Sequence, residues 1–200
     1  MSATVASGAA GGNRLRGAAW LTFALLVVVT LASAFLRLAE PAGVGGLAID
    51  LARGTHRVSA SAALVLAIGV AIFGWERLRP LGASRGVAAA LVALGVALSF
   101  LGRFTPSTHP FVALGNPLGG LAMVAAAWWL YLAASPLLPK EGRLRSRRGG
   151  VGWALIGAAF AAVAAIVTWP PSLLAGLAVQ SVATVALAAG IGMLYRSASR

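Results

Sequence analysis

The chain has 200 residues, of which 60% are apolar and only 10% are charged, and its formal net charge is +12. A soluble domain carries about 25% charged residues, because its whole surface must be solvated. The composition therefore excludes an ordinary water-soluble domain and favours a protein surrounded by lipid. The positive charge does not indicate nucleic-acid binding, because the arginines lie between long apolar runs rather than on one exposed face.

Few residues in the chain are chemically reactive. The sequence has no cysteine, which excludes disulfides, thiolate metal sites and a thiol nucleophile. The carboxylates are limited to four residues: Glu40, Asp50, Glu76 and Glu141. Acid–base or metal chemistry must therefore come from these four side chains, from the two histidines or from a bound cofactor.

Six apolar segments are long enough, or nearly so, to cross a hydrocarbon layer about 30 Å thick, which takes roughly 20 helical residues. In chain order the expected helices are Ala18–Leu38, His56–Trp75, Gly86–Leu101, Pro110–Ala134, Val151–Trp169 and Ser172–Tyr195. Lipid offers no partners for unpaired backbone groups, and the alternating pattern of a β-barrel is absent from the sequence. We therefore expect an all-α integral membrane protein with six transmembrane helices.

The basic residues fall unequally on the two sides of these helices. One side has twelve: Arg14, Arg16, Arg77, Arg79, Arg85, Lys140, Arg143, Arg145, Arg147, Arg148, Arg196 and Arg200. The other side has four: Arg37, Arg53, Arg57 and Arg103. Because cytoplasmic loops carry the excess of Lys and Arg, both termini are expected in the cytoplasm, with the protein in a bacterial-type inner (plasma) membrane. Residues 1–16 are then a flexible cytoplasmic tail.

The first apolar segment has a second interpretation. Ala32-Ser33-Ala34 follows an apolar run behind two arginines, which is also how a cleavable signal peptide ends. Cleavage there would leave five helices and would not change the orientation of the others. The run continues through Phe35-Leu36, and a signal peptide usually has a shorter apolar region, so an uncleaved helix is the main expectation.

His56 is expected to begin the second helix, on the outer side of the membrane. Its helical face continues through small residues between 59 and 67, and a histidine above such a groove is a sensible axial ligand for haem iron. Arg57, with Arg53 and Arg37 nearby, could neutralise the haem propionates. The alternative is an interfacial histidine in contact with water and lipid headgroups.

His109 lies between the third and fourth expected helices, with prolines on both sides that would stiffen the turn. If haem is bound, His109 is the expected second iron ligand, ahead of an open iron and of Met123. Asn116 is seven residues further on, about 10 Å along a regular helix, so both cannot reach one iron. Asn116-Pro117 is also an ordinary helix start, which would place the beginning of the fourth helix at Pro117.

Short motifs at the outer ends of the first four expected helices share their pattern with a known family: Arg37-Leu38, Gly46-Leu47-Ala48, Asp50, His56-Arg57, Leu101-Gly102, Thr105 and Phe111-Val112. In these motifs residues 18–134 resemble one four-helix half of the haem A synthase family, membrane enzymes that oxidise a methyl group of haem O. The resemblance implies an antiparallel four-helix bundle over residues 17–135, with His56 as a haem ligand.

The sequence also departs from that family. The second haem histidine of the family falls on Asn116, the catalytic glutamate falls on Arg53, and the outer-loop cysteines are absent. A full family member has two four-helix halves, whereas here a basic loop at 136–150 and two further helices within 151–196 follow the first half. The resemblance therefore carries over the fold better than the activity.

We expect a haem A synthase-like membrane protein that binds haem of the b or O/A type and is linked to haem A biosynthesis and cytochrome oxidase assembly. His56 and His109 would hold the iron, and Arg57 and Arg37 the propionates. If the protein is an enzyme, it is an oxidoreductase that oxidises haem O. The alternatives are a non-catalytic b-type haem protein that transfers electrons, and a cofactor-free subunit that acts with a respiratory or assembly partner or as a homo-oligomer.

The charge distribution makes a prediction about topology. Because the chain has no native cysteine, a single Ser146→Cys substitution introduces one unique thiol. This thiol should be protected from membrane-impermeant maleimide in intact cells and become reactive when the cells are opened. Labelling from the periplasmic face of intact cells would show that the orientation is inverted, and a mature N-terminus at Phe35 would show that the first segment is a signal peptide.

Overall fold

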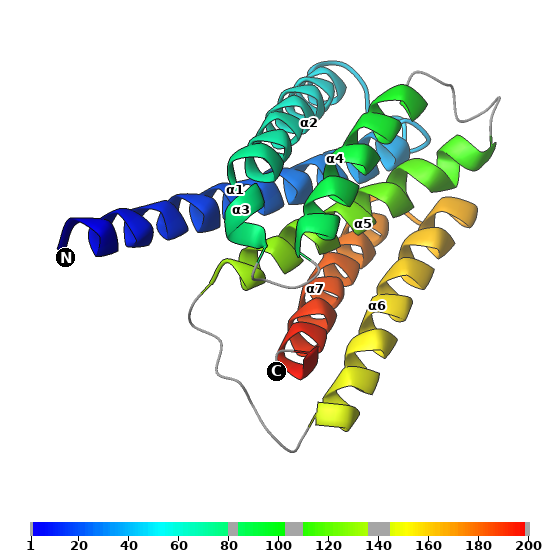
Figure 1. Ribbon diagram of the computed structural model, residues 1–200. Helices are drawn as coiled ribbons and strands as arrows, with labels where there is room; N and C mark the ends of the chain where they lie inside the picture. The colour runs from blue at the N-terminus through cyan, green and yellow to red at the C-terminus, as the bar shows by residue number, and fades with distance from the viewer. Residues whose placement is uncertain (1, 80–83, 103–109, 136–144, 199–200) are drawn as a thin grey trace.

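The computed structural model describes residues 2–79, 84–102, 110–135 and 145–198, and within these ranges the regular structure is entirely helical (Figure 1). The helices are α1 (Ser2–Ala39), α2 (Leu47–Phe73), α3 (Trp75–Leu78), α4 (Ser84–Leu101), α5 (Pro110–Ala133), α6 (Arg145–Thr168) and α7 (Leu173–Ala198). All except the short α3 are long and apolar enough to cross a membrane. The prediction of an all-α protein with six spanning helices is confirmed.

The outer surface of the helices is apolar, which fits a lipid environment. Val65 on α2 is 69% exposed, and Val182 on α7 is 68% exposed. The buried positions are instead often alanine, as at Ala63, Ala127 and Ala183. Membrane bundles commonly have large apolar side chains facing lipid and small side chains between helices. In lipid the hydrophobic effect does not drive helices together, so close packing of their backbones holds the bundle together.

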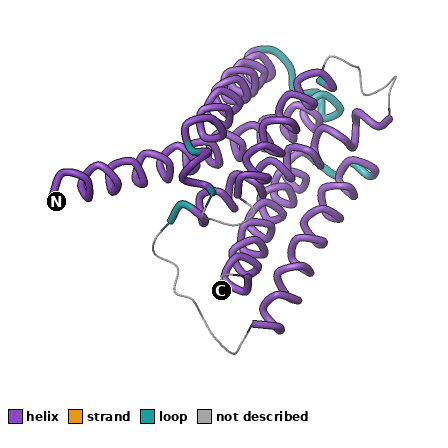
Figure 2. The backbone as a smooth tube through the Cα atoms, viewed as in Figure 1, coloured by secondary structure: helices purple, strands orange, loops and turns teal. Residues whose placement is uncertain are grey.

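Helices α1, α2, α4 and α5 pack together as the expected four-helix bundle, and each runs opposite to the one before it (Figures 1 and 2). Helix α7 packs against both α1 and α5, and α6 lies alongside α7 at the edge of the molecule. Gly176 on α7 makes room for this contact, because a Cβ at this position would collide with the side chain of Leu38. The last two helices are therefore joined to the bundle mainly through α7, and α6 also contacts α5.

Three of the expected helix starts differ from the structure by more than two residues. Helix α6 begins at Arg145 instead of Val151, so the end of the expected basic loop at 136–150 is helical. Helix α1 begins at Ser2 instead of near Ala18, and its N-terminal end extends beyond the rest of the bundle (Figure 1). Helix α2 begins at Leu47 instead of His56. The chain reverses in a tight turn whose glycines, Gly43 and Gly46, have φ angles of 72° and 64°, so the helix begins directly after the second glycine.

The possible start of the fourth helix at Pro117 is wrong. Helix α5 begins at Pro110 and continues past Pro117, which lies inside it. A proline inside a helix removes one backbone hydrogen bond, and membrane helices tolerate this where neighbouring helices cover the freed carbonyl. Pro117 is buried, in keeping with that explanation.

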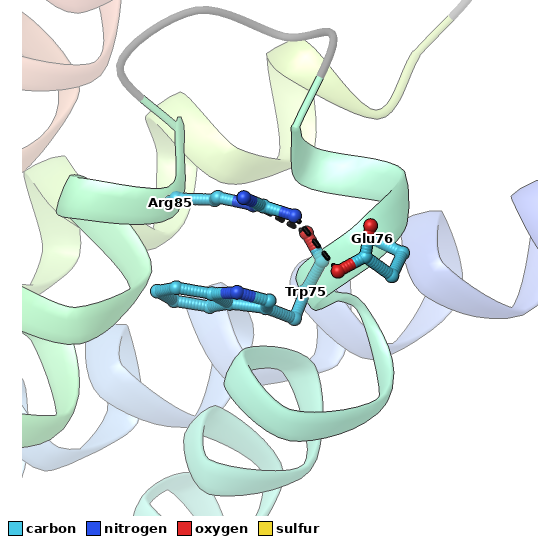
Figure 3. Close-up of polar contacts among 3 residues, drawn as sticks. All are labelled: Trp75, Glu76 and Arg85. Carbon is cyan, nitrogen blue, oxygen red and sulfur yellow. Dashed lines mark hydrogen bonds and ion pairs between the residues drawn. The ribbon is translucent and has the colours of Figure 1, made fainter.

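Arg85 at the start of α4 fixes the connection from α2 through α3 (Figure 3). Its Nε donates to the backbone oxygen of Trp75 at 2.8 Å, and its Nη2 donates to Oε1 of Glu76 at 3.0 Å. Its guanidinium carbon also lies 4.9 Å from the centroid of the Trp75 ring. Because Glu76 is mostly exposed, the ion pair alone contributes little, and the three contacts act as one anchor for this turn.

Helices α6 and α7 approach each other closely at Gly152 and Gly190. A Cβ added at Gly190 would lie 2.7 Å from the carbonyl oxygen of Gly152, and one at Gly152 would lie 2.9 Å from that of Gly190. Both obstacles are backbone atoms, which cannot rotate away. The two glycines therefore set the distance between these helices.

This contact predicts different effects for two glycines of α7. Gly190→Ala should destabilise the folded protein by about 1–3 kcal/mol, because the helices must separate to admit the methyl group. Gly192→Ala is the matched control, since a Cβ there meets nothing within 4 Å, and it should be neutral or stabilising by up to about 1 kcal/mol. Thermal unfolding in detergent measures both changes. Equal unfolding temperatures for the two variants would contradict the close packing of α6 and α7.

Candidate functional site

A cavity of about 390 Å³ lies within the four-helix bundle, and Gln180 of α7 also lines it. Its size falls within the range of about 300–1,000 Å³ that is usual for small-molecule and cofactor sites. Side chains with polar or sulfur atoms come from every wall: Thr30, Ser33, Arg37, His56, Arg57, Ser61, Ser99, Asn116, Met123 and Gln180. Such a collection within an apolar bundle indicates a binding site.

His56 lies in the third turn of α2, inside the membrane-spanning part, and it lines the cavity. Its Nδ1 is 3.3 Å from the backbone oxygen of Val29 on α1. A carbonyl oxygen can only accept, so Nδ1 carries the proton and donates it. The tautomer with its proton on Nδ1 has its lone pair on Nε2. Histidines that bind metals commonly hold their other ring nitrogen in this way, by donating it to a carbonyl.

Arg37 from α1 and Arg57 from α2 also line the cavity. Nη1 of Arg37 donates to Oγ of Ser33 at 3.3 Å, which orients its guanidinium. Within the described ranges neither arginine forms an ion pair with a carboxylate, and no carboxylate lines the cavity. The site therefore has an excess of positive charge and is suited to a ligand with anionic groups.

Arg53 does not belong to this cavity, contrary to its expected place beside the propionates. It lies 3.8 Å from the carboxylate of Asp50, three residues earlier on the same helix, and both side chains are more than half exposed. Arg53 and Asp50 line a separate shallow hollow at the turn between α1 and α2. The position at which the resemblance places a catalytic glutamate therefore lies outside the cavity that contains His56.

Helix α5 directs two of the expected residues toward the cavity. Asn116 and Met123 are seven residues apart, about two helical turns, and both line the same cavity as His56. Met123 is buried, and its methyl group lies close to Gly95 on α4. His109, the expected second iron ligand, lies outside the described residues.

The small-residue groove next to His56 differs in register from the expected one. Ala60, Ser61 and Leu64 line the cavity. Ala63 and Ala67 are instead buried in the core between helices. The cavity wall of α2 is therefore the face that continues from Arg57, and the alanines expected beneath the histidine serve helix packing.

Gln180 on α7 is a site residue that the sequence analysis missed. Its side chain is 1% exposed and lines the cavity, and its Oε1 has no hydrogen-bond partner in the described part of the chain. An unpaired buried carbonyl is unfavourable, so this oxygen is available to a donor on a bound molecule or to water. The available signal was a single amide residue in the middle of an otherwise apolar span.

The described residues include no group of three His, Cys, Asp or Glu side chains that could hold a bare metal ion. A metal at His56 would have to arrive with most of its ligands already attached, as the iron of a haem does. Comparison with known proteins adds no identification, since no family model, curated protein or solved structure matches the chain. The structure thus defines a multi-pass helical membrane protein with one histidine and two arginines around an internal cavity.

Proposed function

We propose that this protein binds haem in the cavity between α1, α2, α4 and α5. The observation that carries the proposal is the arrangement of His56, whose Nδ1 donates to the oxygen of Val29 and whose Nε2 is left free beside the cavity. An ionisable residue inside a membrane span is costly to bury and is usually functional. Coordination of iron by Nε2 would give this histidine a reason to be there.

The other residues of the cavity fit the same ligand. Arg37 and Arg57 would hold the propionates, because the guanidinium group matches carboxylate geometry and stays charged. Ala60, Gly95 and Gly120 line the cavity with small side chains or none, which leaves space for a flat ring between the helices. A bound haem would supply one-electron redox chemistry. The protein's part is to hold the iron, neutralise the propionates and exclude water.

The second position on the iron has two candidates. His109 was expected from the sequence, and it precedes α5, the helix that also bears Asn116. The thioether sulfur of Met123 is the other atom in the cavity lining that binds haem iron in proteins. Asn116, on which the family's second histidine falls, lines the cavity but is a poor iron ligand. Its position supports the register of the resemblance, because that register places residue 116 at the haem site.

The resemblance to the haem A synthase family supports a role in haem A biosynthesis and cytochrome oxidase assembly. A non-catalytic b-type haem protein is the second candidate, because Arg53 stands where the family has its catalytic glutamate. This arginine pairs with Asp50 outside the cavity. Oxidation of haem O therefore lacks the carboxylate that the family uses, whereas haem binding requires only residues that line the cavity.

The proposed location is a bacterial-type plasma membrane with both termini in the cytoplasm. The charge bias of twelve basic residues against four supports this orientation. It places the cavity in the outer half of the membrane, since Arg37 lies near the outer end of α1 and His56 near that of α2. A redox partner would then exchange electrons with the haem from the outer side, or within a homo-oligomer or assembly complex.

Wild-type protein purified from a haem-replete host should show a Soret band, and extraction with mass analysis should distinguish haem b from haem O or A. Arg57→Gln should lower haem retention about two- to fivefold, as expected for one partly exposed charge pair. Arg53→Gln is the matched control and should leave retention unchanged, because Arg53 does not line the cavity. A wild-type protein without a Soret band would reject the proposal.

A further inference from the structure

A third hollow lies at the opposite end of the bundle from the His56 cavity, between α1 and α5. It has a volume of about 490 Å³ and is lined by Asn13, Arg16, Gly17, Trp20 and Tyr131. Asn13, Arg16 and Gly17 lie in the first two turns of the membrane-spanning part of α1, which begins at Gly12. Tyr131 lies in the last turn of the spanning part of α5, which ends at Ala133. Both helices therefore place the hollow at a membrane surface.

The residues of this hollow suit a phosphate group above an acyl chain. Arg16 forms no ion pair with any carboxylate of the described ranges, and Asn13 and Tyr131 line the same hollow. Trp20 is 48% exposed, and its ring centroid lies 5.4 Å from that of Tyr131. Aromatic rings at this depth contact the boundary between lipid headgroups and acyl chains.

The hollow is held open by the residues around it. Gly17 has no side chain, and a Cβ added there would meet nothing within 4 Å. Trp128, behind Tyr131, stacks on that ring with centroids 5.1 Å apart and so supports it from the protein side. Arg85, on the same end of the bundle, offers a contrast. Its guanidinium is already used by Trp75 and Glu76, whereas that of Arg16 is available.

We propose that the hollow binds the phosphate of an anionic phospholipid, with Arg16 as the charged contact, Asn13 and Tyr131 as hydrogen-bonding groups and Trp20 as the wall against the acyl chains. Basic hollows between membrane helices are suited to anionic headgroups. The lipid, rather than a soluble phosphate compound, is the occupant because the hollow opens at the membrane surface with an exposed indole. This site is independent of haem binding.

Native mass spectrometry of the full chain, equilibrated with phosphatidylglycerol and phosphatidylcholine in equal amounts, tests the proposal. Wild-type protein should retain phosphatidylglycerol in preference. Arg16→Gln should reduce that retention about fivefold, the factor that corresponds to about 1 kcal/mol for one basic residue at an anionic membrane surface. Arg14→Gln is the matched control, since it removes the same charge two residues away but does not line the hollow, and it should change retention less than twofold.

Three results would overturn the proposal: equal effects of Arg14→Gln and Arg16→Gln, equal retention of the two lipids by the wild type, and displacement of the lipid by inorganic phosphate. The first would indicate attraction by net charge alone, and the last would indicate a phosphate site that needs no lipid. Tyr131→Phe provides a second variant if Arg16→Gln does not fold. It should reduce retention of phosphatidylglycerol, and unchanged retention would count against the proposal.

Discussion

A polar side chain inside a hydrocarbon layer must find its hydrogen-bond partner within the protein, and this requirement organises the interior of the bundle. The buried hydroxyl groups meet it locally. Thr22, Thr30 and Thr184 each donate to a backbone oxygen one turn earlier on their own helix. His56 and Gln180 cannot do so fully, since Nε2 of the histidine and Oε1 of the glutamine remain without protein partners in the described ranges. Both line one cavity, where a ligand can satisfy them. The buried Nε1 atoms of Trp128 and Trp129 also lack partners in the described ranges, and they do not line this cavity.

The packing of the helices follows from the same arrangement. Alanine and glycine between α1, α2, α4 and α5 bring the backbones close enough for His56 on α2 to reach the Val29 oxygen on α1. Helix α7 then contributes Gln180 to the cavity and packs against α1 and α5, which makes α7 part of the site. In a four-helix bundle alone, the side of the cavity that Gln180 lines would be open to lipid. The described cavity is therefore built by five helices and not by the four-helix bundle alone.

Hydropathy was sufficient to predict the six spanning helices, because length and apolar composition are local properties of each segment. The beginning of α2 at Leu47 was not predicted. The charged residues Asp50, Arg53 and Arg57 lowered the hydropathy of residues 47–57, so this stretch was not recognised as part of a membrane helix. The structure shows that Asp50 and Arg53 form an exposed pair on one face of the helix, while His56 and Arg57 reach the cavity.

The sequence was least informative about features that depend on packing between helices, such as which residues face the cavity. The register of the proposed resemblance singled out Asn116, and this residue lines the cavity. Gln180 could not be placed in this way, since its helix has no counterpart in the resemblance and its role depends on which face of α7 meets α1 and α5. Pro117 was ambiguous for a related reason. Whether a proline begins or interrupts a membrane helix depends on the neighbouring helices that cover the freed backbone group.

The most direct test of the central claim is the absorption spectrum of His56→Gly protein, recorded with and without added imidazole. If Nε2 of His56 binds haem iron, the variant should lose the wild-type haem spectrum. Free imidazole, entering the space left by the side chain, should restore it. A His56→Gly protein that retains the wild-type spectrum without imidazole would show that this histidine does not bind the iron and would contradict the account.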